Sequence, residues 1–597
     1  MTVYSAPVGE TRFVLNHVLR IADMANVPGY EALDADSLDA ILDGVGKFAA
    51  NVLHPLNQRG DELGCLRQAD GSVVTPEGFK QAWKQWVEAG WPSLEGNPQY
   101  GGMGLPKVLA SAVSEYVLSA NQSFETYTGL TNAAVSALEA AAPESIKATY
   151  LPRMVSGEWS GTMNLTEPHC GTDLGLIRTR AERAADGTYR ITGSKIFITG
   201  GEQDLTENIA HLVLARLPDA PPGVRGISMF IVPKFLPDAD GALGKRNSLS
   251  CGSIEHKMGL RGSATCAMNY EDATGWLIGE ENRGLAAMFV MMNAARLSVG
   301  LQGVAQAEVA FQNAKAYAME RRQGRAGKEP LEVGQAADPL IAHPDVRRML
   351  FEAKAHTEGL RALCLWAANL VDLAALADDR ETRVEAEELL ALLTPVIKAF
   401  ATDKGFDTTV NCQQIWGGHG YICENGMDQF VRDARLAMIY EGANGVQAMD
   451  LVGRKLFANE GRAFAMLNRK IAAMVECCTA EPALAEIAQA LDGAQSTLKE
   501  TARHLLAETA CNPANLGAAA NAFLHLTGTV TMGYIWLQMA LAALQPEAQG
   551  AFGREYCATK VETARFYAAR MLPDCAGLAA KVKADAQGWL SLPFEQI

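Results

Sequence analysis

An acidic side chain at a glycine-containing turn is the first candidate for chemistry in this sequence. The stretch from Arg432 to Leu451 reads RDARLAMIYEGANGVQAMDL, and its glycines can adopt backbone angles that are costly for other residues. The pattern predicts two helical segments with a sharp turn between them, and Glu441 lies in that turn. A carboxylate at such a turn can point into a cleft and act as a general base. The alternative is that Glu441 only caps the second helix, where an acid interacts favourably with the helix dipole.

A second motif lies a short distance upstream of this turn. Residues 413–421 read QQIWGGHGY. The segments QIWGGHGY and IYEGANGVQ together resemble the C-terminal signature of the acyl-CoA dehydrogenase family. The resemblance implies that Glu441 is the base that starts dehydrogenation and that Gly442 lies at the substrate. It also implies that Gln414, Gly417 and Gly418 contact flavin adenine dinucleotide (FAD) across a subunit interface.

Two motifs in the middle of the chain are candidates for the flavin itself. The segments MNLTEPHCGTDLG, from Met163, and KIFITGG, from Lys195, resemble two further signatures of the family. A flavin ring needs a flat apolar wall and hydrogen-bond donors near its polar edge, and an aromatic ring and two threonine hydroxyls can provide these. The alternative is that these are ordinary strand residues, since β-branched and aromatic types favour strands. The residues that the resemblance places on the flavin are Thr166, Phe197, Ile198 and Thr199.

Two arginines and one more threonine complete the predicted site. The segment YAMERRQGRA, from Tyr317, resembles the helix end whose arginine reaches the FAD pyrophosphate in a neighbouring subunit, which falls on Arg321. A guanidinium fork suits a diphosphate, although an exposed structural arginine is the alternative. By resemblance Arg296 lies beneath the active-site glutamate, unless it is purely structural, and Thr172 lies near the CoA portion of the substrate.

The position of the base can be checked against a second location. Some relatives carry the glutamate on the first long helix of the C-terminal domain, just before an arginine. In this chain the residue before Arg296 is Ala295, and residues 285–306 contain no Asp or Glu. Glu441 is therefore the only candidate at either location.

The composition limits the class of partner and compartment. The 597 residues carry a net charge of −16, which argues against nucleic acid, because phosphate contacts need a basic face. The 12 cysteines are scattered without a CxxC pair, and there is no HExxH, so we expect reduced thiols in the cytoplasm and no metal site. Residues 513–546 lack charged side chains, but many polar residues interrupt the stretch. We therefore expect a buried bundle helix there and no transmembrane segment.

Hydrophobic periodicity predicts a mainly α protein with a central β domain. Strand-like runs between Trp159 and Ile278 predict a small barrel or sandwich. The expected parts are an N-terminal extension (1–35), an N-terminal helical domain (36–158), a middle β domain (159–280), a C-terminal helical bundle (281–461) and a C-terminal helical extension (462–597).

This order and length resemble the larger bacterial branch of the acyl-CoA dehydrogenase family, which includes 3-methylmercaptopropionyl-CoA and fatty acyl-CoA dehydrogenases. The resemblance implies an FAD-dependent oxidoreductase that converts an acyl-CoA thioester to a trans-2-enoyl-CoA, as in β-oxidation of fatty acids. It further implies electron-transfer flavoprotein as the acceptor and a homodimer. The alternatives are an acyl-CoA oxidase that uses oxygen and an alkylation-response-type flavoprotein that binds DNA. Peripheral membrane contact through the C-terminal extension is a further option.

Overall fold

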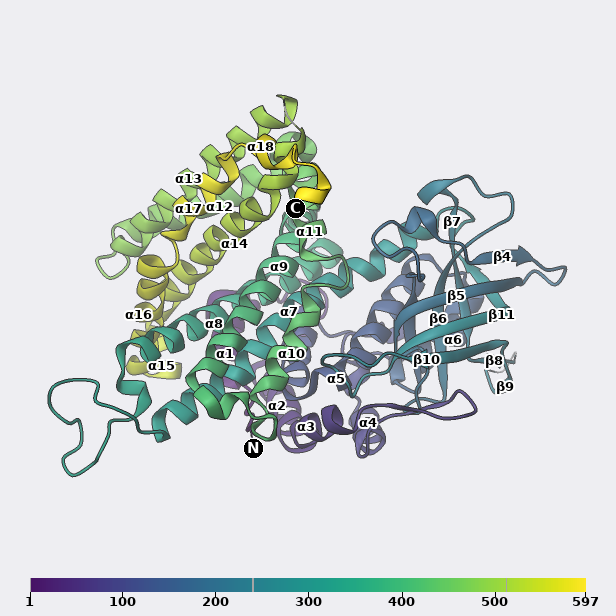
Figure 1. Cartoon of the computed structure of the whole chain (residues 1–597), viewed down its shortest axis with the longest axis horizontal. Coiled ribbons are helices and arrows are strands. Elements are labelled where there is room, and N and C mark those ends of the chain that lie inside the picture. Colours follow the sequence, from purple (N-terminus) through teal and green to yellow (C-terminus); the bar gives the residue numbers. More distant parts are fainter. Residues whose placement is uncertain (1, 239–240, 512) are drawn as a thin grey trace. The chain divides into compact units, whose positions relative to one another are not determined.

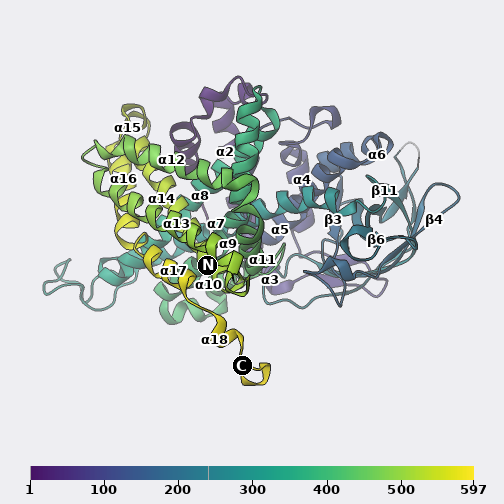
Figure 2. The same cartoon turned by 90° about the horizontal axis from the view of Figure 1, so that it is seen from above.

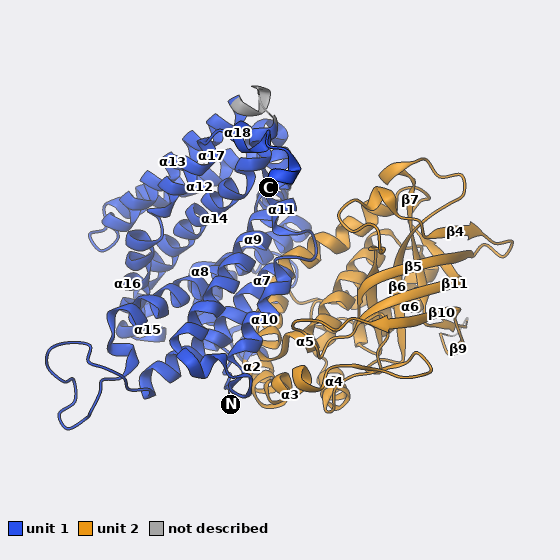
Figure 3. Ribbon diagram, in the orientation of Figure 1, with its two compact units in different colours: residues 1–42, 299–597 blue, residues 43–298 orange. Residues whose placement is uncertain are grey.

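The computed structural model describes residues 2–238, 241–511 and 513–597. The chain forms two compact units, coloured blue and orange in Figure 3. Unit 1 comprises residues 1–42 and 299–597, and unit 2 comprises residues 43–298. These two units do not correspond to the five parts predicted from the sequence, so the five-part division remains a prediction.

Helices dominate the chain in sequence order (Figure 1). The helices are α1 Val8–Phe13, α2 Ala35–Phe48, α3 His54–Leu63, α4 Phe79–Glu88, α5 Lys107–Ala141, α6 Glu144–Ser156, α7 Gly284–Glu320, α8 Pro344–Leu376, α9 Arg380–Ile415, α10 Met427–Ala437, α11 Asn444–Asp450, α12 Arg462–Thr479, α13 Ala485–Cys511, α14 Pro513–Ala543, α15 Pro546–Phe552, α16 Arg554–Arg570, α17 Asp574–Lys583 and α18 Gln587–Leu590. The strands are β1 Leu66–Arg67, β2 Val73–Val74, β3 Trp159–Asn164, β4 Arg180–Arg183, β5 Tyr189–Thr199, β6 Asn208–Arg216, β7 Ile227–Pro233, β8 Phe235–Pro237, β9 Leu243–Arg246, β10 Leu249–Ile254 and β11 Thr265–Ile278. The predicted fold class, mainly α with a central β domain, is confirmed.

The strands of unit 2 close into a barrel-like ring. β11 pairs with β5 and β7, β5 pairs with β4, β4 with β6, and β6 with β7. β3 extends the sheet beside β6 in parallel, and β10 extends it beside β11. Every residue of β7 is buried, as expected for a strand covered on both faces. The ring fits the predicted small barrel, and it provides the two segments predicted to contact a flavin.

The helical part of unit 2 surrounds an aromatic cluster. Trp83 and Trp86 of α4 are buried and pack against Phe124 of α5, with ring centroids 5.7 and 6.3 Å apart. The long helix α5 breaks at Asn121, whose φ of −159° and ψ of 90° are not helical. The Asn121 side chain then accepts a hydrogen bond from the backbone N–H of Phe124 at 3.1 Å, which restarts the helix in the manner of an N-cap.

Unit 1 is a helical bundle to which the C-terminal extension adds further helices. Helices α12, α13, α14, α16 and α17 lie side by side in both views of Figures 1 and 2. The charge-free stretch predicted as a buried helix is α14, and its Trp536 is fully buried and donates a hydrogen bond to the Ala355 carbonyl on α8 at 3.0 Å. Helices of the C-terminal extension thus pack on α8 and α9.

Two helices, α7 and α8, are long and apolar enough to cross a membrane on length and composition alone. Within the protein, 50% and 67% of their most apolar windows are buried. Core helices of globular proteins pass the same test, so this is only a weak indication of a membrane span.

Candidate active site

Glu441 lies in the turn between α10 and α11, where the sequence predicts it. The backbone of Glu441 is left-handed, with φ of 54°, and the next residue, Gly442, is also left-handed, with φ of 85°. A non-glycine residue in this region costs on the order of 1–2 kcal/mol and persists only where the surroundings hold it. The Asn444 N–H donates to the Met438 carbonyl at 3.1 Å and so closes the turn around the partly exposed Glu441.

Gln447 supports the same turn from inside the protein. Its side chain is fully buried, and Nε2 donates to the Gly442 carbonyl at 3.2 Å and lies 3.5 Å from the Glu441 carbonyl. These contacts hold the backbone on both sides of the turn apex. The structure therefore stores backbone strain at the one acidic side chain that the sequence predicts to be catalytic.

The glycine-rich motif of unit 1 offers an open surface. Gln414, Gly417 and Gly418 are exposed, and an added Cβ at either glycine would meet nothing within 4 Å. The neighbouring Gln413 is used differently, since its Nε2 donates to the Gly420 carbonyl at 2.9 Å. In the described part of the chain the Gln414 side chain has no hydrogen-bond partner. The motif therefore combines one glutamine that builds the turn with another that faces solvent.

Arg321 lies at the end of α7, in the same region of unit 1. Tyr317, one turn earlier, stacks on Trp416 with ring centroids 4.4 Å apart and lies 2.8 Å from His419 Nδ1. The helix end and the glycine-rich turn are therefore neighbours. Within the described residues Arg321 has no ion-pair partner, whereas Arg322 pairs with Glu332 and Arg325 with Asp338. Of the three arginines, Arg321 is thus the one that remains available for an anionic ligand.

In unit 2 a β-bulge exposes Phe197. The pairing of β5 with β11 shifts between Cys266 and Met268, which leaves one extra residue on β5. Phe197 lies in this bulge with φ of 59°, and 60% of its side chain is exposed. Bulges re-aim side chains and are frequent beside binding sites. A large apolar ring held outward in a strained conformation is a suitable wall for a flat ligand.

The predicted threonine donors lie around this bulge. The N–H of Ile196 donates to the Thr166 carbonyl at 2.9 Å, so Thr166 lies beside the bulge. Thr166 and Thr199 are both partly exposed, and neither hydroxyl has a hydrogen-bond partner among the residues described. Ile198 differs, because only 1% of it is exposed and it packs in the barrel core. The predicted contact of Ile198 with a flavin stays a prediction, and because its side chain lies in the core, the backbone is the part of Ile198 that can face a ligand.

A buried ion pair holds the Thr166 segment in place. Lys195 and Glu167 are both buried and lie 2.8 Å apart, and Lys195 also donates to the Leu165 carbonyl. Burial lowers the pKa of Lys195 to about 8. Burial opposes ionisation of Glu167, but Lys195 and the N–H groups of Arg178 and Thr179 bring its pKa below the usual value.

The same segment contains the one group of potential metal ligands found among the described residues. Glu167, His169 and Cys170 bring ligand atoms within 4.8 Å of one another. Both Glu167 oxygens already accept hydrogen bonds, and His169 Nε2 lies 2.9 Å from the Leu176 carbonyl. These Glu167 and His169 atoms already make hydrogen bonds within the protein, so the group is a poor match for a metal ion.

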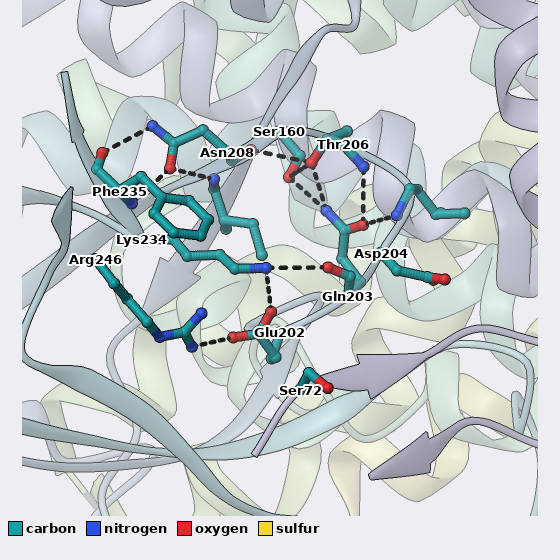
Figure 4. A network of polar contacts seen from close by, with 12 residues as sticks. Ser72, Ser160, Glu202, Gln203, Asp204, Thr206, Asn208, Lys234, Phe235 and Arg246 are labelled. Atoms are coloured by element: carbon teal, nitrogen blue, oxygen red, sulfur yellow. Dashed lines mark hydrogen bonds and ion pairs between the residues drawn. The ribbon is translucent and has the colours of Figure 1, made fainter. Parts of the chain in front are cut away.

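A second buried charge cluster anchors the turn that follows β5 (Figure 4). Glu202 is fully buried and pairs with Lys234, and with Arg246 at 2.7 Å. Beside it the buried Gln203 donates to the hydroxyls of Ser160 and Thr206. These contacts fix the backbone just after Thr199, so the predicted flavin residues stand on a rigid support.

Two predicted substrate residues occupy different environments within unit 2. Thr172 is exposed in the loop after β3. Arg296 is buried on α7, and its Nη1 donates to Asn293 Oδ1 at 3.3 Å. Thr172 is accessible to a large ligand, whereas Arg296 lies beneath the surface, and both roles stay predictions.

Comparison with known proteins identifies the family. Family models described as the N-terminal, middle and C-terminal domains of acyl-CoA dehydrogenase match residues 35–158, 162–273 and 282–457. A model described as acetyl-CoA dehydrogenase C-terminal like matches residues 467–593. The 3-methylmercaptopropionyl-CoA dehydrogenase of Ruegeria pomeroyi is 44% identical over 97% of this chain and 98% of its own length. The chain belongs to the acyl-CoA dehydrogenase family.

Other relatives of this acyl-CoA dehydrogenase cover it almost completely. The broad-specificity linear acyl-CoA dehydrogenase FadE5 of Mycobacterium tuberculosis is 33% identical over 96% of each chain. The solved structure of an acyl-CoA dehydrogenase from Bacillus anthracis, complexed with FAD, matches with a TM-score of 0.72 at 20% identity, over 97% of this chain and 93% of that one. The C-terminal extension is thus part of the shared fold.

The family is one of FAD flavoproteins, and the residues of this acyl-CoA dehydrogenase fit the cofactor. Unit 2 presents an exposed aromatic wall and two threonine hydroxyls that have no hydrogen-bond partner within the described part of the chain. Unit 1 presents an arginine without a salt bridge within the described chain, an exposed glutamine and a glycine pair that allows close approach. These groups match a ring, its polar edge and a diphosphate.

Sequence reasoning missed the residues that support the Glu441 turn. Asn444, Asp403 and His525 form a connected group in unit 1, although no motif spacing links them. One signal was present in the sequence, because His525 interrupts a long stretch without charged side chains. A polar side chain on a buried helix needs a hydrogen-bond partner. In the structure the partner of His525 is Asp403.

Proposed function

We propose that this protein is an FAD-dependent acyl-CoA dehydrogenase that converts an acyl-CoA thioester to the trans-2-enoyl-CoA, with Glu441 as the base. The observation that carries the proposal is the strained, left-handed Glu441 in the turn between α10 and α11. The alternative, that Glu441 caps helix α11, is not supported by the geometry. Helix α11 begins only at Asn444, and its N-cap residue is Ala443.

The reaction removes two hydrogens from adjacent carbons. A Glu441 oxygen takes the proton from the α-carbon, and the electron pair of that C–H bond becomes the new π bond between the α- and β-carbons. Bound FAD supplies the acceptor for the hydride that leaves the β-carbon. Gln447 and the closed turn hold the backbone that carries Glu441 in one conformation, so this backbone does not have to be ordered during the reaction.

The residues predicted for the cofactor have separate roles in this proposal. Phe197, Thr166 and Thr199 hold the flavin ring by apolar contact and hydrogen bonds, and Arg321, Gln414, Gly417 and Gly418 hold a diphosphate portion. By the family resemblance the latter group serves the FAD of a neighbouring subunit, so we propose a homodimer. Light scattering on the holoprotein tests this, with an expected mass of about twice the 63.9 kDa of one chain.

The substrate we propose first is 3-methylmercaptopropionyl-CoA. The support is the relative of that name, which is 44% identical along nearly the whole chain. A linear fatty acyl-CoA is the second candidate, supported by the relative described as a broad-specificity linear acyl-CoA dehydrogenase. We further propose that electrons pass to electron-transfer flavoprotein and that the enzyme acts in the cytoplasm in fatty-acid oxidation or a related pathway.

A panel of thioesters tests the function and ranks the substrates. The purified protein is mixed anaerobically with acyl-CoA esters of short to long chains and with 3-methylmercaptopropionyl-CoA, and flavin bleaching and enoyl-CoA formation are measured. We expect one class of thioester to bleach the flavin and to yield one enoyl-CoA per flavin. Fast reoxidation by oxygen would favour an oxidase instead. The absence of bleaching with every thioester, together with retention on DNA at low salt, would support the DNA-binding alternative.

A further inference from the structure

A chain of polar contacts leads from the C-terminal extension to the Glu441 turn, entirely within unit 1. His525 Nε2 on α14 lies 2.9 Å from Asp403 Oδ2 on α9. The other carboxylate oxygen, Oδ1, accepts a hydrogen bond from Asn444 Nδ2 at 2.7 Å. His525 and Asp403 are 122 positions apart in the sequence. The contact therefore exists only because α14 of the extension packs on α9.

Asn444 connects this chain to the turn itself. Its side chain is buried, and besides Asp403 it contacts Lys398 Nζ at 2.9 Å and Thr402 Oγ1 at 3.0 Å. Asn444 is also the first residue of α11, and its backbone N–H donates to the Met438 carbonyl across the turn. The side chain of Asn444 thus anchors one end of the segment that carries Glu441, and α9 provides the anchor.

The position of His525 is itself restricted. Its ring packs edge-on against Phe400 of α9, with centroids 5.8 Å apart. One turn later α14 approaches Phe400 so closely that a Cβ on Gly528 would lie 2.5 Å from the ring. The close helix contact leaves His525 little freedom, and its Nε2 is directed at Asp403.

We propose that His525 is a positioning residue for the Glu441 turn, acting through Asp403 and Asn444. The inference rests on the proposed role of Glu441 as the base. His525 donates to Asp403 and fixes its carboxylate, so that the second oxygen keeps Asn444 seated on α9. Since Glu441 holds a left-handed conformation, a loosened turn relaxes away from the reactive geometry, and small misplacements of a catalytic group slow reactions strongly. The extension therefore contributes to the active site and does more than cover the bundle.

The test uses four single variants of the FAD-loaded, full-length protein and the double variant His525→Ala/Asp403→Ala. His525→Ala removes the donor, and His525→Gln keeps an N–H donor near the position of Nε2. Asp403→Ala removes the connecting carboxylate. Gln538→Ala is the matched control, because Gln538 is also partly buried on α14 but, among the residues described, its side chain bonds only Tyr534 of the same helix. The measurements are the single-turnover rate of flavin reduction, the dissociation constant of the acyl-CoA, and hydrogen–deuterium exchange of residues 438–447.

We expect His525→Ala to reduce flavin about tenfold more slowly than wild type, with the dissociation constant unchanged within about twofold. Residues 438–447 should exchange faster in His525→Ala and Asp403→Ala but not in Gln538→Ala, and His525→Gln should recover most of the rate. The double variant should be no slower than Asp403→Ala alone, because both changes break one chain of contacts. A wild-type rate and wild-type exchange in His525→Ala, or additive effects in the double variant, would overturn the proposal.

Two further comparisons keep the interpretation unambiguous. If His525→Ala does not fold, His525→Gln is compared with Asp403→Ala. Asp403→Ala removes the carboxylate between His525 and Asn444, whereas His525→Gln keeps a donor to it, so only Asp403→Ala should slow flavin reduction. Glu441→Gln is measured beside them. If it reduces flavin at the wild-type rate, the assignment of the base fails, whereas the exchange data still report whether His525 holds the turn.

Discussion

At the scale of single residues, the candidate site depends on side chains that behave differently from their sequence neighbours. Gln413 bonds the Gly420 carbonyl, whereas Gln414 faces solvent. Arg322 and Arg325 are tied into ion pairs, whereas Arg321 has none among the described residues. Phe197 is turned outward by a bulge, and the next residue, Ile198, is turned into the core. Local geometry therefore decides which of several neighbouring side chains can contact a ligand.

The glutamine pair gives a matched test at this scale. Gln414→Ala should weaken FAD binding by about fivefold, the loss expected for one hydrogen bond of about 1 kcal/mol, and should leave the melting temperature unchanged. Gln413→Ala should instead lower the melting temperature, because it removes the bond that closes the turn at Gly420. Titration of apoprotein with FAD and thermal unfolding measure both. If Gln413→Ala alone weakened FAD binding, the assignment of Gln414 would be reversed.

The sequence predicts the parts of the candidate site that short motifs carry. It does not predict the parts that depend on contacts between residues far apart in the chain. The position of Glu441 in a turn between two helices was predictable, because a short motif carries it. The burial of Ile198 was not, since a bulge changes which side of the strand each residue faces and no spacing rule reveals it. Asn444 was also missed, because its partner Asp403 lies 41 positions away on another helix.

At the scale of elements, helix α5 shows what hydrophobic periodicity hides. Helix α5 runs from Lys107 to Ala141, but its backbone leaves the helical conformation at Asn121. Just after the break, Glu125 is buried and accepts a hydrogen bond from the Ser114 hydroxyl at 2.7 Å. It lines a cavity of about 40 Å³ together with Trp86 and Trp91. Burial raises the pKa of Glu125 to about 8.

This shift predicts a pH dependence of stability. The folded protein keeps the Glu125 proton up to about pH 8, whereas an unfolded chain releases it near the ordinary value of 4.5. Folding therefore takes up a proton between these values, and the stability due to Glu125 falls as pH rises through this window. Glu125→Gln should remove this dependence and should melt at a higher temperature than wild type above pH 8. The charged groups near Glu125 are Lys107, which lowers its pKa, and Glu95, which raises it.

Thermal unfolding between pH 4.5 and 9 measures this prediction as the difference in melting temperature between wild type and variant. The difference should grow with pH and level off above about 8. Glu144→Gln is the control, because Glu144 is exposed at the start of α6 and its one ion-pair partner in the described chain is Lys147. A constant difference between wild type and Glu125→Gln across the range would contradict the assigned protonation of Glu125.

At the scale of the whole chain, unit 1 is assembled from its two ends. Phe13 near the N-terminus packs against Phe552 and Tyr556 of the C-terminal extension, with centroids 5.7 and 5.6 Å apart. The sequence predicts residues 1–35 as an extension but gives no sign of this partner, because the contacting residues are separated by more than 500 positions. The fold class was predictable from periodicity, whereas the pairing of the two ends required the structure.

A buried charge cluster joins these ends and predicts a stability effect. Lys560 on α16 is 1% exposed and pairs with Glu10 of α1 and with Glu358 of α8. Lys560→Met should lower the free energy of unfolding of unit 1, but by less than the roughly 3–5 kcal/mol expected for a buried carboxylate left without any cation. The reason is that the buried Glu358 keeps its pair with Lys354 and that Glu10 is partly exposed. Adding Glu358→Gln should recover part of the loss.

Denaturant unfolding measures these variants against Lys583→Met, which removes an exposed ion pair with Glu500. An exposed pair contributes about 0–1 kcal/mol, so the control should change little. Equal destabilisation by Lys560→Met and Lys583→Met would show that the cluster does not join the two ends of the chain.

The central claim is that Glu441 is the base, and the most direct measurement is single-turnover flavin bleaching by the best thioester, wild type beside Glu441→Gln. The variant keeps the shape of the side chain but cannot accept the α-proton. We predict that Glu441→Gln retains FAD and binds the acyl-CoA but bleaches at least a thousandfold more slowly, within the range for a lost general base. Bleaching of Glu441→Gln at the wild-type rate would contradict the account.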